Sequence, residues 1–378
     1  MEAYLDNSAT TPVCREAADK IMEAVTSLYG NPSSLHEKGF EAEKLLKDSR
    51  TNVAKVLCCE ADRLFFTAGG TEANNLALFG IARSMKRSGN KIVTTAFEHP
   101  SVAKCMDALE NEGFNVTRIA PDASGNIPAE AFREAIDENT ILVAVMAVNN
   151  ETGSIQPIKK IRSIIEEKHS PALFHCDCVQ AFGKVNMRTI TPFVDTMSIS
   201  SHKIHGPKGV GALYIKKGIR LSPLIFGGGQ EHDIRPGTEP MPAIAGFGAA
   251  AAALPNPEKT LEKVSQLKER LVSKLSQFDD VVINSPDNAL PYVINLSVLG
   301  IRSEPMINFL SDMEIYVSAG SACSKGHRSE ALTALGISPD RIDSALRVSL
   351  SRFTTEEHID MLVDGIDKCR KFLRRSKR

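Results

Sequence analysis

The sequence has 378 residues, of which 42% are hydrophobic and 24% charged, enough for a large core and two domains. Its formal net charge of −1 gives no electrostatic reason to expect a nucleic acid or an acidic membrane surface as partner. No apolar run reaches the ~18–20 residues that cross a bilayer, and the N-terminus lacks a signal-peptide pattern. We therefore expect a cytoplasmic protein that binds neither a membrane nor, directly, a nucleic acid.

Apolar β-type runs alternate with helical patterns over the first part of the chain, which implies a mainly parallel sheet covered on both faces, an α/β fold. The expected strands are 63–70, 91–97, 115–121, 140–148, 172–178, 196–200 and 210–215, and helices are expected over 71–87, 128–137 and 157–169.

The pattern changes after the alanine-rich segment 243–254. A long charged helix over 257–277 and a terminal helix are expected there. Three further strands are expected over 281–285, 292–300 and 314–320. We therefore expect a second, smaller α+β domain, with the break near residue 250.

A βα turn, Ala68 to Asn74, joins the first strand to its helix. Such a turn offers free backbone N–H groups and the positive end of a helix dipole, which suit a phosphate, and Thr71 adds a hydroxyl. The alternative is an ordinary turn in which Thr71 caps the helix. The glycine spacing fits neither a Walker loop nor a dinucleotide fingerprint.

Polar residues also end three other strands. His99 could stack on a planar ring, and the amides of Asn149 and Asn150 could bond a phenolic oxygen. Asp177 needs a cationic partner if it is buried, and a protonated pyridine nitrogen is one. The alternatives are that His99 caps the next helix and that Asp177 pairs with an arginine or a lysine. In open α/β sheets, ligands bind at the carboxyl ends of the strands, where these candidates fall.

Lys203 follows the strand 196–200 in the run Ser200-Ser201-His202-Lys203. A lysine held against the core loses hydration, which lowers its pKa and makes its amine nucleophilic. This chemistry suits a lysine that holds pyridoxal phosphate as a Schiff base, with an acidic partner on the pyridine nitrogen. Since most lysines in turns are merely solvated, the interpretation depends on the residues that accompany Lys203.

The eight cysteines do not predict a disulfide framework in a cytoplasmic chain of this size. Cys58-Cys59 and Cys176-x-Cys178 are the nearest approach to a metal motif, but no second pair follows with zinc-finger spacing. We expect no metal site.

Motifs along nearly the whole chain resemble those of the NifS/IscS-type cysteine desulfurases, which are fold type I pyridoxal-phosphate enzymes. The matching segments are YLDNSATTP (4–12), GNPSSLHEKG (30–39), FTAGGTEANN (66–75), EHPSV (98–102), VNNETG (148–153), HCDCVQ (175–180), SSHKIHGPKG (200–209), GGGQE and RPGTE (227–239), SAGSACS (318–324) and RVSLSRFTTEE (347–357). The resemblance implies a large cofactor-binding domain (16–250) with a mainly parallel seven-stranded sheet. It also implies a small domain (1–15 and 251–378) that carries a catalytic cysteine loop.

The resemblance implies a role for each motif residue. Lys203 would hold the cofactor and take the Cα proton of the substrate, Asp177 would pair with the pyridine nitrogen, and His99 would stack on the ring and shuttle a proton. The implied cofactor-binding residues are Lys203, Asp177, Gln180, Asn150, His99, Thr71, Gly70, Ser200 and His202, with Thr238 reaching the phosphate of a neighbouring subunit in a homodimer. Arg347 and Asn31 would bind the substrate, Arg347 by clamping its carboxylate.

Cys323 lies in a run of small residues, 318–326, which leaves its thiol reachable rather than buried and inert. A free thiol has a pKa of ~8.5, so a fraction is thiolate at neutral pH. The resemblance implies that this thiolate takes the sulfur of L-cysteine as a persulfide and releases L-alanine. The persulfide would pass to an acceptor protein, either an iron–sulfur scaffold or a thiolation enzyme.

Two other functions remain open at this point. One is a selenocysteine lyase or another small-substrate pyridoxal enzyme of the same fold, such as an aminotransferase, although Cys323 argues against an aminotransferase. The other is a non-catalytic scaffold, against which the intact set of Lys203, Asp177, His99 and Arg347 argues. The basic tail after residue 367 is either a docking segment or a solvated helix end.

Overall fold

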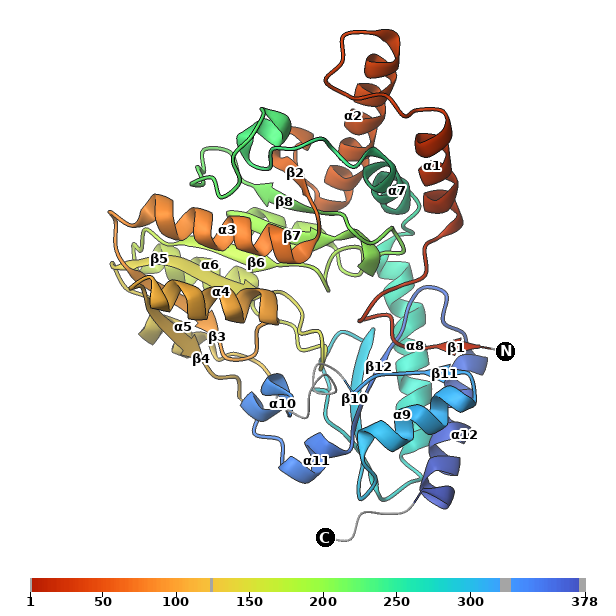
Figure 1. Ribbon diagram of the computed structural model, residues 1–378. Helices are drawn as coiled ribbons and strands as arrows, with labels where there is room; N and C mark the ends of the chain where they lie inside the picture. The colour runs from red at the N-terminus through yellow and green to blue at the C-terminus, as the bar shows by residue number, and fades with distance from the viewer. Residues whose placement is uncertain (1, 123–124, 320–327, 374–378) are drawn as a thin grey trace.

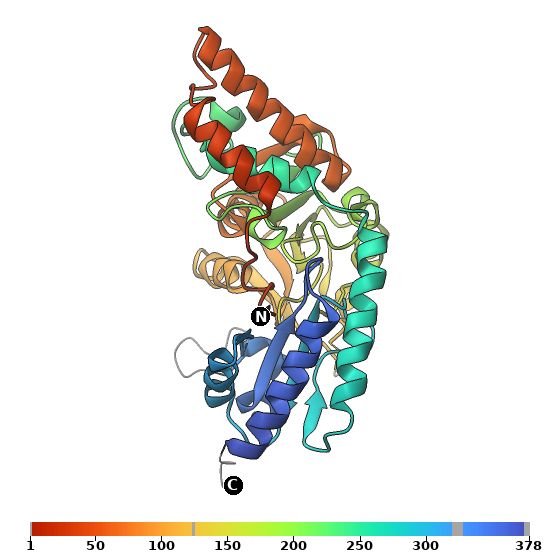
Figure 2. The same cartoon turned by 90° about the vertical axis from the view of Figure 1, so that its right-hand side faces the viewer.

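The computed structural model describes residues 2–122, 125–319 and 328–373. In Figure 1 the chain forms an upper part around a large sheet and a lower part around smaller sheets, with the N-terminus lying between the two parts in Figure 2. Among the described residues, no helix combines the length and the apolar character that a membrane-spanning segment requires. The predicted Cys323 and the end of the basic tail (374–378) lie outside the described residues.

The large sheet has seven strands in the order β2-β8-β7-β6-β5-β3-β4. Only β8 runs antiparallel to its neighbours, so the prediction of a mainly parallel seven-stranded sheet is confirmed. The strands are β2 (Leu64–Thr67), β3 (Lys91–Thr95), β4 (Asn115–Ile119), β5 (Thr140–Met146), β6 (Leu173–Asp177), β7 (Thr196–Ser200) and β8 (Gly211–Ile215).

Helices cover both faces of this sheet, as the buried strands require. Successive residues of β5 show this, because Leu142 packs in the cluster of α3 and α4 and Val143 in the cluster of α5 and α6. Helices α1 and α2 pack on α7 at the top of Figure 1. The helices of this part are α1 (Arg15–Thr26), α2 (Glu37–Leu57), α3 (Gly70–Met85), α4 (Pro100–Asn111), α5 (Ala129–Ala135), α6 (Ile158–Glu167) and α7 (Met241–Ala252). Short 3-10 helices are η1 (Ala61–Arg63), η2 (Met187–Thr189), η3 (Thr191–Phe193), η4 (Ser201–Lys203) and η5 (Gln230–Asp233).

The lower part holds a three-stranded antiparallel sheet, β12-β10-β9, and a two-stranded parallel pair, β1-β11. The strands are β1 (Ala3–Tyr4), β9 (Val281–Ile283), β10 (Val293–Val298), β11 (Ile315–Tyr316) and β12 (Ala345–Ser349). Its helices are α8 (Pro257–Leu275), α9 (Ser303–Asp312), α10 (Glu330–Ala334), α11 (Pro339–Asp343) and α12 (Glu356–Phe372). The strand expected over 314–320 is thus shorter, and its partner is the N-terminal strand β1 rather than β9 or β10.

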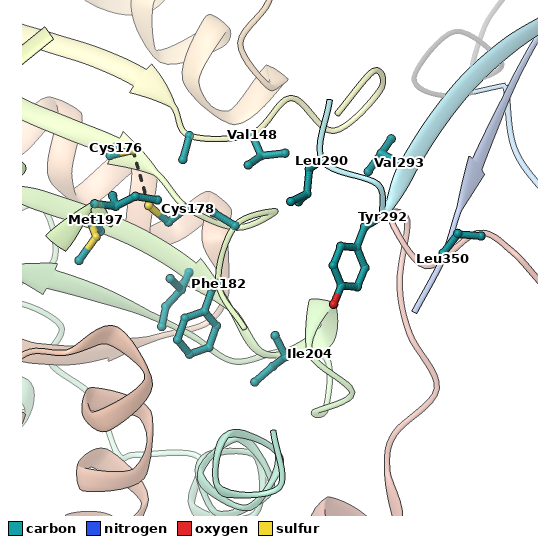
Figure 3. Close-up of a cluster of buried hydrophobic side chains, with 14 of the residues drawn as sticks. Val148, Cys176, Cys178, Phe182, Met197, Ile204, Leu290, Tyr292, Val293 and Leu350 are labelled. Atoms are coloured by element: carbon teal, nitrogen blue, oxygen red, sulfur yellow. Dashed lines mark hydrogen bonds between the residues drawn. The ribbon is translucent and has the colours of Figure 1, made fainter. Parts of the chain in front are cut away.

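One continuous apolar core joins the two parts. Figure 3 shows Tyr292 and Leu350 of the lower part beside Ile204 and Phe182 of the upper part. Phe182 is fully buried and packs edge-on against Phe247 of α7, with ring centroids 6.1 Å apart. This shared core sets the lower part against the carboxyl ends of the large sheet.

Candidate active site

A cavity of about 380 Å³ opens where β5, β6 and β7 end, next to the lower part. It is lined by the strand-end residues Met146, Asp177 and Ser200, by residues of the adjoining loops, and by Arg347 of β12. The full lining is Ser8, Ala9, Gly70, Thr71, His99, Pro100, Ser101, Met146, Val148, Asn150, Asp177, Val179, Gln180, Ser200, His202, Lys203 and Arg347. The cavity is therefore where open α/β sheets place their ligands.

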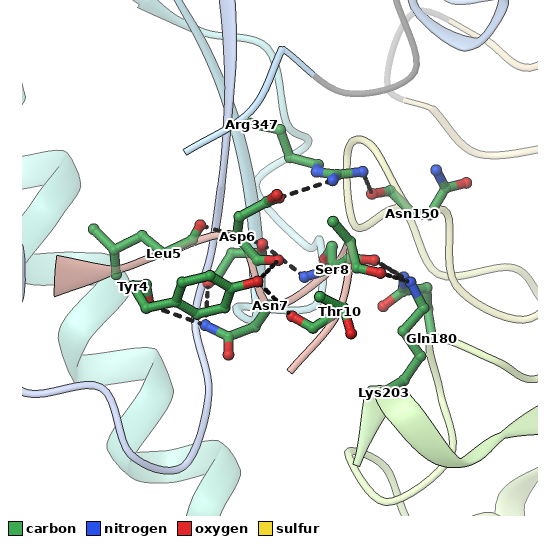
Figure 4. Close-up of polar contacts among 12 residues, drawn as sticks. Tyr4, Leu5, Asp6, Asn7, Ser8, Thr10, Asn150, Gln180, Lys203 and Arg347 are labelled. Carbon is green, nitrogen blue, oxygen red and sulfur yellow. Dashed lines mark hydrogen bonds and ion pairs between the residues drawn. The ribbon is translucent and has the colours of Figure 1, made fainter. Parts of the chain in front are cut away.

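Lys203 reaches the cavity from η4, directly after β7. Its Nζ donates hydrogen bonds to the carbonyl oxygens of Ser8 and Ala9, the second at 2.7 Å, as Figure 4 shows for Ser8. Burial, and after it the positive charge of Arg347, lower the pKa of Lys203 to about 8 against the raising effects of Asp6 and Asp177. Because main-chain carbonyls accept without adding charge, they hold the amine in place and leave it easily deprotonated.

Asp177 ends β6 on the floor of the cavity and is buried. Its Oδ2 accepts from the Nδ2 of Asn74 at 2.9 Å, and its Oδ1 accepts from the backbone N–H of Val179 at 2.9 Å. In the described part of the chain its partners are therefore an amide and a backbone N–H, not the arginine or lysine of the alternative. These neutral donors stabilise the carboxylate and leave its charge for a cation in the cavity.

His99 is both a helix cap and a cavity residue, so the cap is confirmed, while the stacking on a ring stays a prediction. Its Nδ1 accepts from the backbone N–H of Ser101 at 3.1 Å at the start of α4, while its ring lines the cavity. Desolvation lowers the pKa of His99, against the raising effect of Asp177. Since Nδ1 accepts, the proton of the neutral ring lies on Nε2.

Gln180 and Asn150 also line the cavity. The Nε2 of Gln180 donates to the carbonyl of Ser8 at 3.1 Å, and its Oε1 accepts from Lys184 Nζ at 2.8 Å. Burial lowers the pKa of Lys184 to about 7, and the charges of Lys203 and Arg347 contribute. By contrast, Asn149 is committed to its own turn, where its Oδ1 accepts from Glu151 and Thr152.

The other end of the cavity is a helix N-terminus beside two hydroxyl-bearing residues. Helix α3 starts at Gly70 and its cap is Gly69 (φ +157°), so the alternative in which Thr71 caps the helix is wrong. A Cβ on Gly70 would lie 2.7 Å from Cγ2 of Val179, which explains a glycine there. Thr71, Ser200 and His202 surround this end, and burial lowers the pKa of His202 to about 4, with Lys203 adding to the effect.

Arg347 is buried in β12 and faces the cavity. Its Nη2 donates to Asp6 at 3.0 Å and its Nη1 to the carbonyl oxygen of Asn150 at 3.2 Å (Figure 4). Its Nε has no hydrogen-bond partner among the described residues. A guanidinium has five donors, so Arg347 keeps donors for a carboxylate in the cavity.

Two predicted residues lie away from this cavity. Thr238 is exposed and Asn31 is exposed near the start of α2, and neither lines the cavity of this protomer. Cys323 falls in the undescribed segment 320–327.

Several residues of the site were not singled out from the sequence, and four of them hold the predicted residues by hydrogen bonds. Ser8 and Ala9 act through main-chain carbonyls, which have no residue-type signal, although they lie in the motif at 4–12. Asn74 and Ser101 lie in the motifs at 66–75 and 98–102. They follow Thr71 and His99 by three and two residues, and this closeness in sequence could have indicated that they belong to the site.

These residues fit pyridoxal phosphate. The cavity has the volume of a small cofactor site. It holds an amine of lowered pKa, a buried carboxylate with neutral partners, and a helix N-terminus flanked by hydroxyl groups. This is the donor set that a pyridine nitrogen, an aldehyde and a phosphate require. The fold and the site therefore define a protein of the pyridoxal-phosphate class.

Comparison with known proteins leads to the same class. The family described as Aminotransferase class-V matches residues 3–362. The chain is 39% identical to the Clostridium botulinum protein named cysteine desulfurase IscS, over 97% of this chain and 94% of that protein. A solved structure of a NifS-like protein superposes with a TM-score of 0.92 at 35% identity, covering 99% and 100% of the two chains. Another, described as SspA in complex with cysteine, has a TM-score of 0.81 at 33% identity, covering 94% and 100%.

The chain belongs to the class-V aminotransferase family and, within it, to the NifS/IscS cysteine desulfurases, which depend on pyridoxal phosphate.

Proposed function

We propose that this desulfurase converts L-cysteine to L-alanine and keeps the sulfur as a persulfide on Cys323. The observation that carries the proposal is that the amine of Lys203 and the guanidinium of Arg347 face one cavity above the carboxylate of Asp177. An amine, a carboxylate-binding group and a site for a pyridine ring are what an amino acid substrate needs. The structure described as SspA in complex with cysteine supports this choice of substrate.

The cofactor would be held at both ends. Asp177 would bind the pyridine nitrogen, Gln180 and Asn150 the phenolic oxygen, and His99 would stack on the ring. Gly70, Thr71, Ser200 and His202 would surround the phosphate at the N-terminus of α3. When bound, pyridoxal phosphate supplies an electron sink that accepts charge from the substrate's Cα.

The chain's own groups would then bind the substrate and move protons. Arg347 would hold the substrate carboxylate with the donors that it does not spend on Asp6 and Asn150. The neutral amine of Lys203 would remove the Cα proton, which its lowered pKa of about 8 favours. His99, whose ring proton lies on Nε2, would move a proton at the substrate sulfur.

The thiolate of Cys323 would attack the sulfur of the bound cysteine. The S–S bond forms as the C–S bond breaks, and the carbon that loses sulfur takes up a proton, so one cysteine and one thiol give one alanine and one persulfide. The residues that flank the undescribed segment support this role. Ser318 forms a β-bridge with Arg347, and the Oγ of Ser329 donates to Glu151 at 2.6 Å, in the loop that carries Asn150.

The test measures L-alanine and protein-bound sulfur made from L-cysteine, with a reductant, by the native protein, Cys323→Ala and Lys203→Ala. We expect alanine and persulfide only from the native protein. Cys323→Ala should retain the cofactor, whereas Lys203→Ala should not hold it after borohydride reduction. The control is Lys217→Ala, an exposed lysine beyond β8. Alanine formation by Cys323→Ala would overturn the persulfide step and favour a lyase.

We also propose that the active enzyme is a homodimer in which Thr238 reaches the phosphate of the neighbouring subunit. Its support is the exposed, apolar surface of α1, α2 and their connection, where Leu35 is 89% exposed. The exposed apolar residues there are Met22, Val25, Tyr29, Leu35 and Phe40. Asn31 lies in the same connection, so its proposed contact with substrate would also be made in the neighbouring subunit.

We propose the domain division 16–250 and 1–15 with 251–378. It is supported by the pairing of β1 with β11 and by the end of α7 at Ala252. The persulfide would pass to an acceptor protein, an iron–sulfur scaffold or a thiolation enzyme, in the cytoplasm.

A further inference from the structure

Asn74 lies beneath the cavity and has no exposed surface. It is on the first turns of α3, and its side chain bonds three residues on two other elements, β6 and α4. Its Nδ2 donates to Asp177 Oδ2 at 2.9 Å and to Ser101 Oγ at 2.8 Å. Its Oδ1 bonds the Nε2 of His175 at 2.9 Å. All of its strong hydrogen-bonding positions are therefore used by side chains of the site floor.

The chemistry of these partners determines where each proton lies. A carboxylate can only accept, so the amide of Asn74 must turn its nitrogen toward Asp177. Its oxygen then faces His175, which must carry its ring proton on Nε2. The Nδ1 of His175 consequently accepts from the hydroxyl of Thr196, 2.9 Å away on the neighbouring strand. Burial lowers the pKa of His175 to about 3, which keeps this ring neutral.

The second amide proton of Asn74 determines the hydrogen bonds that lead through Ser101 to His99, which we call the His99 branch; the bonds to Asp177 form the Asp177 branch. Ser101 Oγ accepts from Asn74, so its own proton is available to His99 Nδ1, 2.8 Å away. The same nitrogen accepts from the backbone N–H of Ser101. Two donors on Nδ1 favour the neutral form of His99 with its proton on Nε2, facing the cavity.

We propose that Asn74 is a positioning residue that sets the protonation of both Asp177 and His99, and so couples the two groups that contact the cofactor ring. The proposal rests on the proposed function of this site. A carboxamide of this length is required, because one group must donate to both Asp177 and Ser101 and accept from His175. Aspartate lacks the donors, and leucine has the size but no polar atoms.

The Asp177 branch is tested by the position of the proton on the ring nitrogen. The probe is pyridoxal phosphate labelled with ¹⁵N in the ring, bound to the holoenzyme and observed by solid-state NMR. A hydrogen bond to the far oxygen of Asp177 makes the carboxylate less basic, so the proton stays on the ring nitrogen. In Asn74→Leu the proton should shift toward Asp177, by about tenfold in the transfer equilibrium for the loss of one hydrogen bond to the carboxylate.

The His99 branch is tested in the protein without cofactor, by NMR titration of the His99 ring, assigned with His99→Gln. In Asn74→Leu the Ser101 hydroxyl loses the donor that directs its own proton toward His99 Nδ1. The neutral ring is then less well stabilised, so the titration midpoint of His99 should rise. Ser101→Ala should raise this midpoint and leave the ring nitrogen of the cofactor unchanged. The charged groups that act on His99 are Asp177, Lys203, Glu151 and Arg347, and these variants retain all of them.

The variant Asn74→Ala, which adds no charge, repeats both measurements if Asn74→Leu does not fold, and both signals should again shift. Asn75→Leu is the matched control and should shift neither, because Asn75 is the half-buried neighbour on the same turn and its Nδ2 donates to the carbonyl oxygen of Thr71. The proposal is overturned if the Asn74 variants shift only one signal or none. A native ring nitrogen that carries no proton would instead overturn the proposed role of Asp177.

Discussion

The guanidinium of Arg347 and the carboxylate of Asp6 lie 3.0 Å apart, although 341 residues separate them in sequence. Asp6 also forms a β-bridge with Ser349, so the N-terminal segment is held along β12. The next residues of that segment, Ser8 and Ala9, accept the hydrogen bonds of Lys203. One short segment thus places the amine of the upper part relative to the guanidinium of the lower part.

Arg347→Lys should impair substrate binding more than chemistry. Lysine keeps the charge but lacks the planar fork that binds a carboxylate through two parallel hydrogen bonds. We expect kcat/KM for L-cysteine to fall by about 10- to 100-fold, mostly through KM. The control is Arg270→Lys, whose arginine binds Asp360 at the surface. A lower kcat with an unchanged KM would contradict the assignment of Arg347 to the substrate carboxylate.

Incorporation of pyridoxal phosphate into the protein without cofactor should speed up as the pH rises through about 8. Only the neutral amine reacts, and the pKa of Lys203 is lowered from 10.5 to about 8, first by burial and then by Arg347. Stopped-flow absorbance across pH measures the midpoint. Arg347→Met removes the positive charge that lowers the pKa of Lys203, while burial still lowers it. The midpoint should therefore move to higher pH but stay below 10.5. A native midpoint near that of an ordinary lysine would refute this prediction.

His175 should make the protein less stable in acid. Burial lowers its pKa from 6.5 in the unfolded chain to about 3, so between these values the unfolded chain binds the additional proton. Stability is therefore lost as the pH falls below 6.5, by about 2 kcal/mol at about pH 5 from this group. His175→Gln removes the titration and keeps a donor toward Asn74. Urea unfolding of both proteins at about pH 6.5 and about pH 5 measures the free energy of unfolding. This free energy should fall less in the variant between the two pH values, and equal falls would contradict the prediction.

Leu35→Asp should weaken the proposed homodimer without unfolding the single chain. Leu35 is 89% exposed beside α2, so a carboxylate there costs little in the monomer but is unfavourable in an apolar interface. Sedimentation velocity should show a larger monomer fraction, and retention of pyridoxal phosphate should fall if Thr238 acts across the interface. Phe372→Asp, at an exposed position on α12, serves as the control. An unchanged monomer fraction would contradict the proposal that this surface forms a dimer interface.

The seven strands of the large sheet were predictable because buried strands leave a local apolar pattern bounded by turns. Strand β12 was missed, and the partner of β11 was not foreseen, because both depend on pairing between distant segments. The cap of α3 was assigned to Thr71 as one alternative, whereas the chain uses Gly69 at φ +157°, a conformation that only glycine adopts easily.

The fold class, the family resemblance and the residue types at the ends of the strands could be inferred from the sequence, because they follow from short-range patterns and motifs. Only the tertiary structure shows which of these residues share the cavity. It brought the carbonyls of Ser8 and Ala9 to Lys203, and Asn74 between Asp177 and His175. The reason is that the direction of a hydrogen bond and the burial of a charge depend on neighbours far away in the chain, which no local pattern encodes.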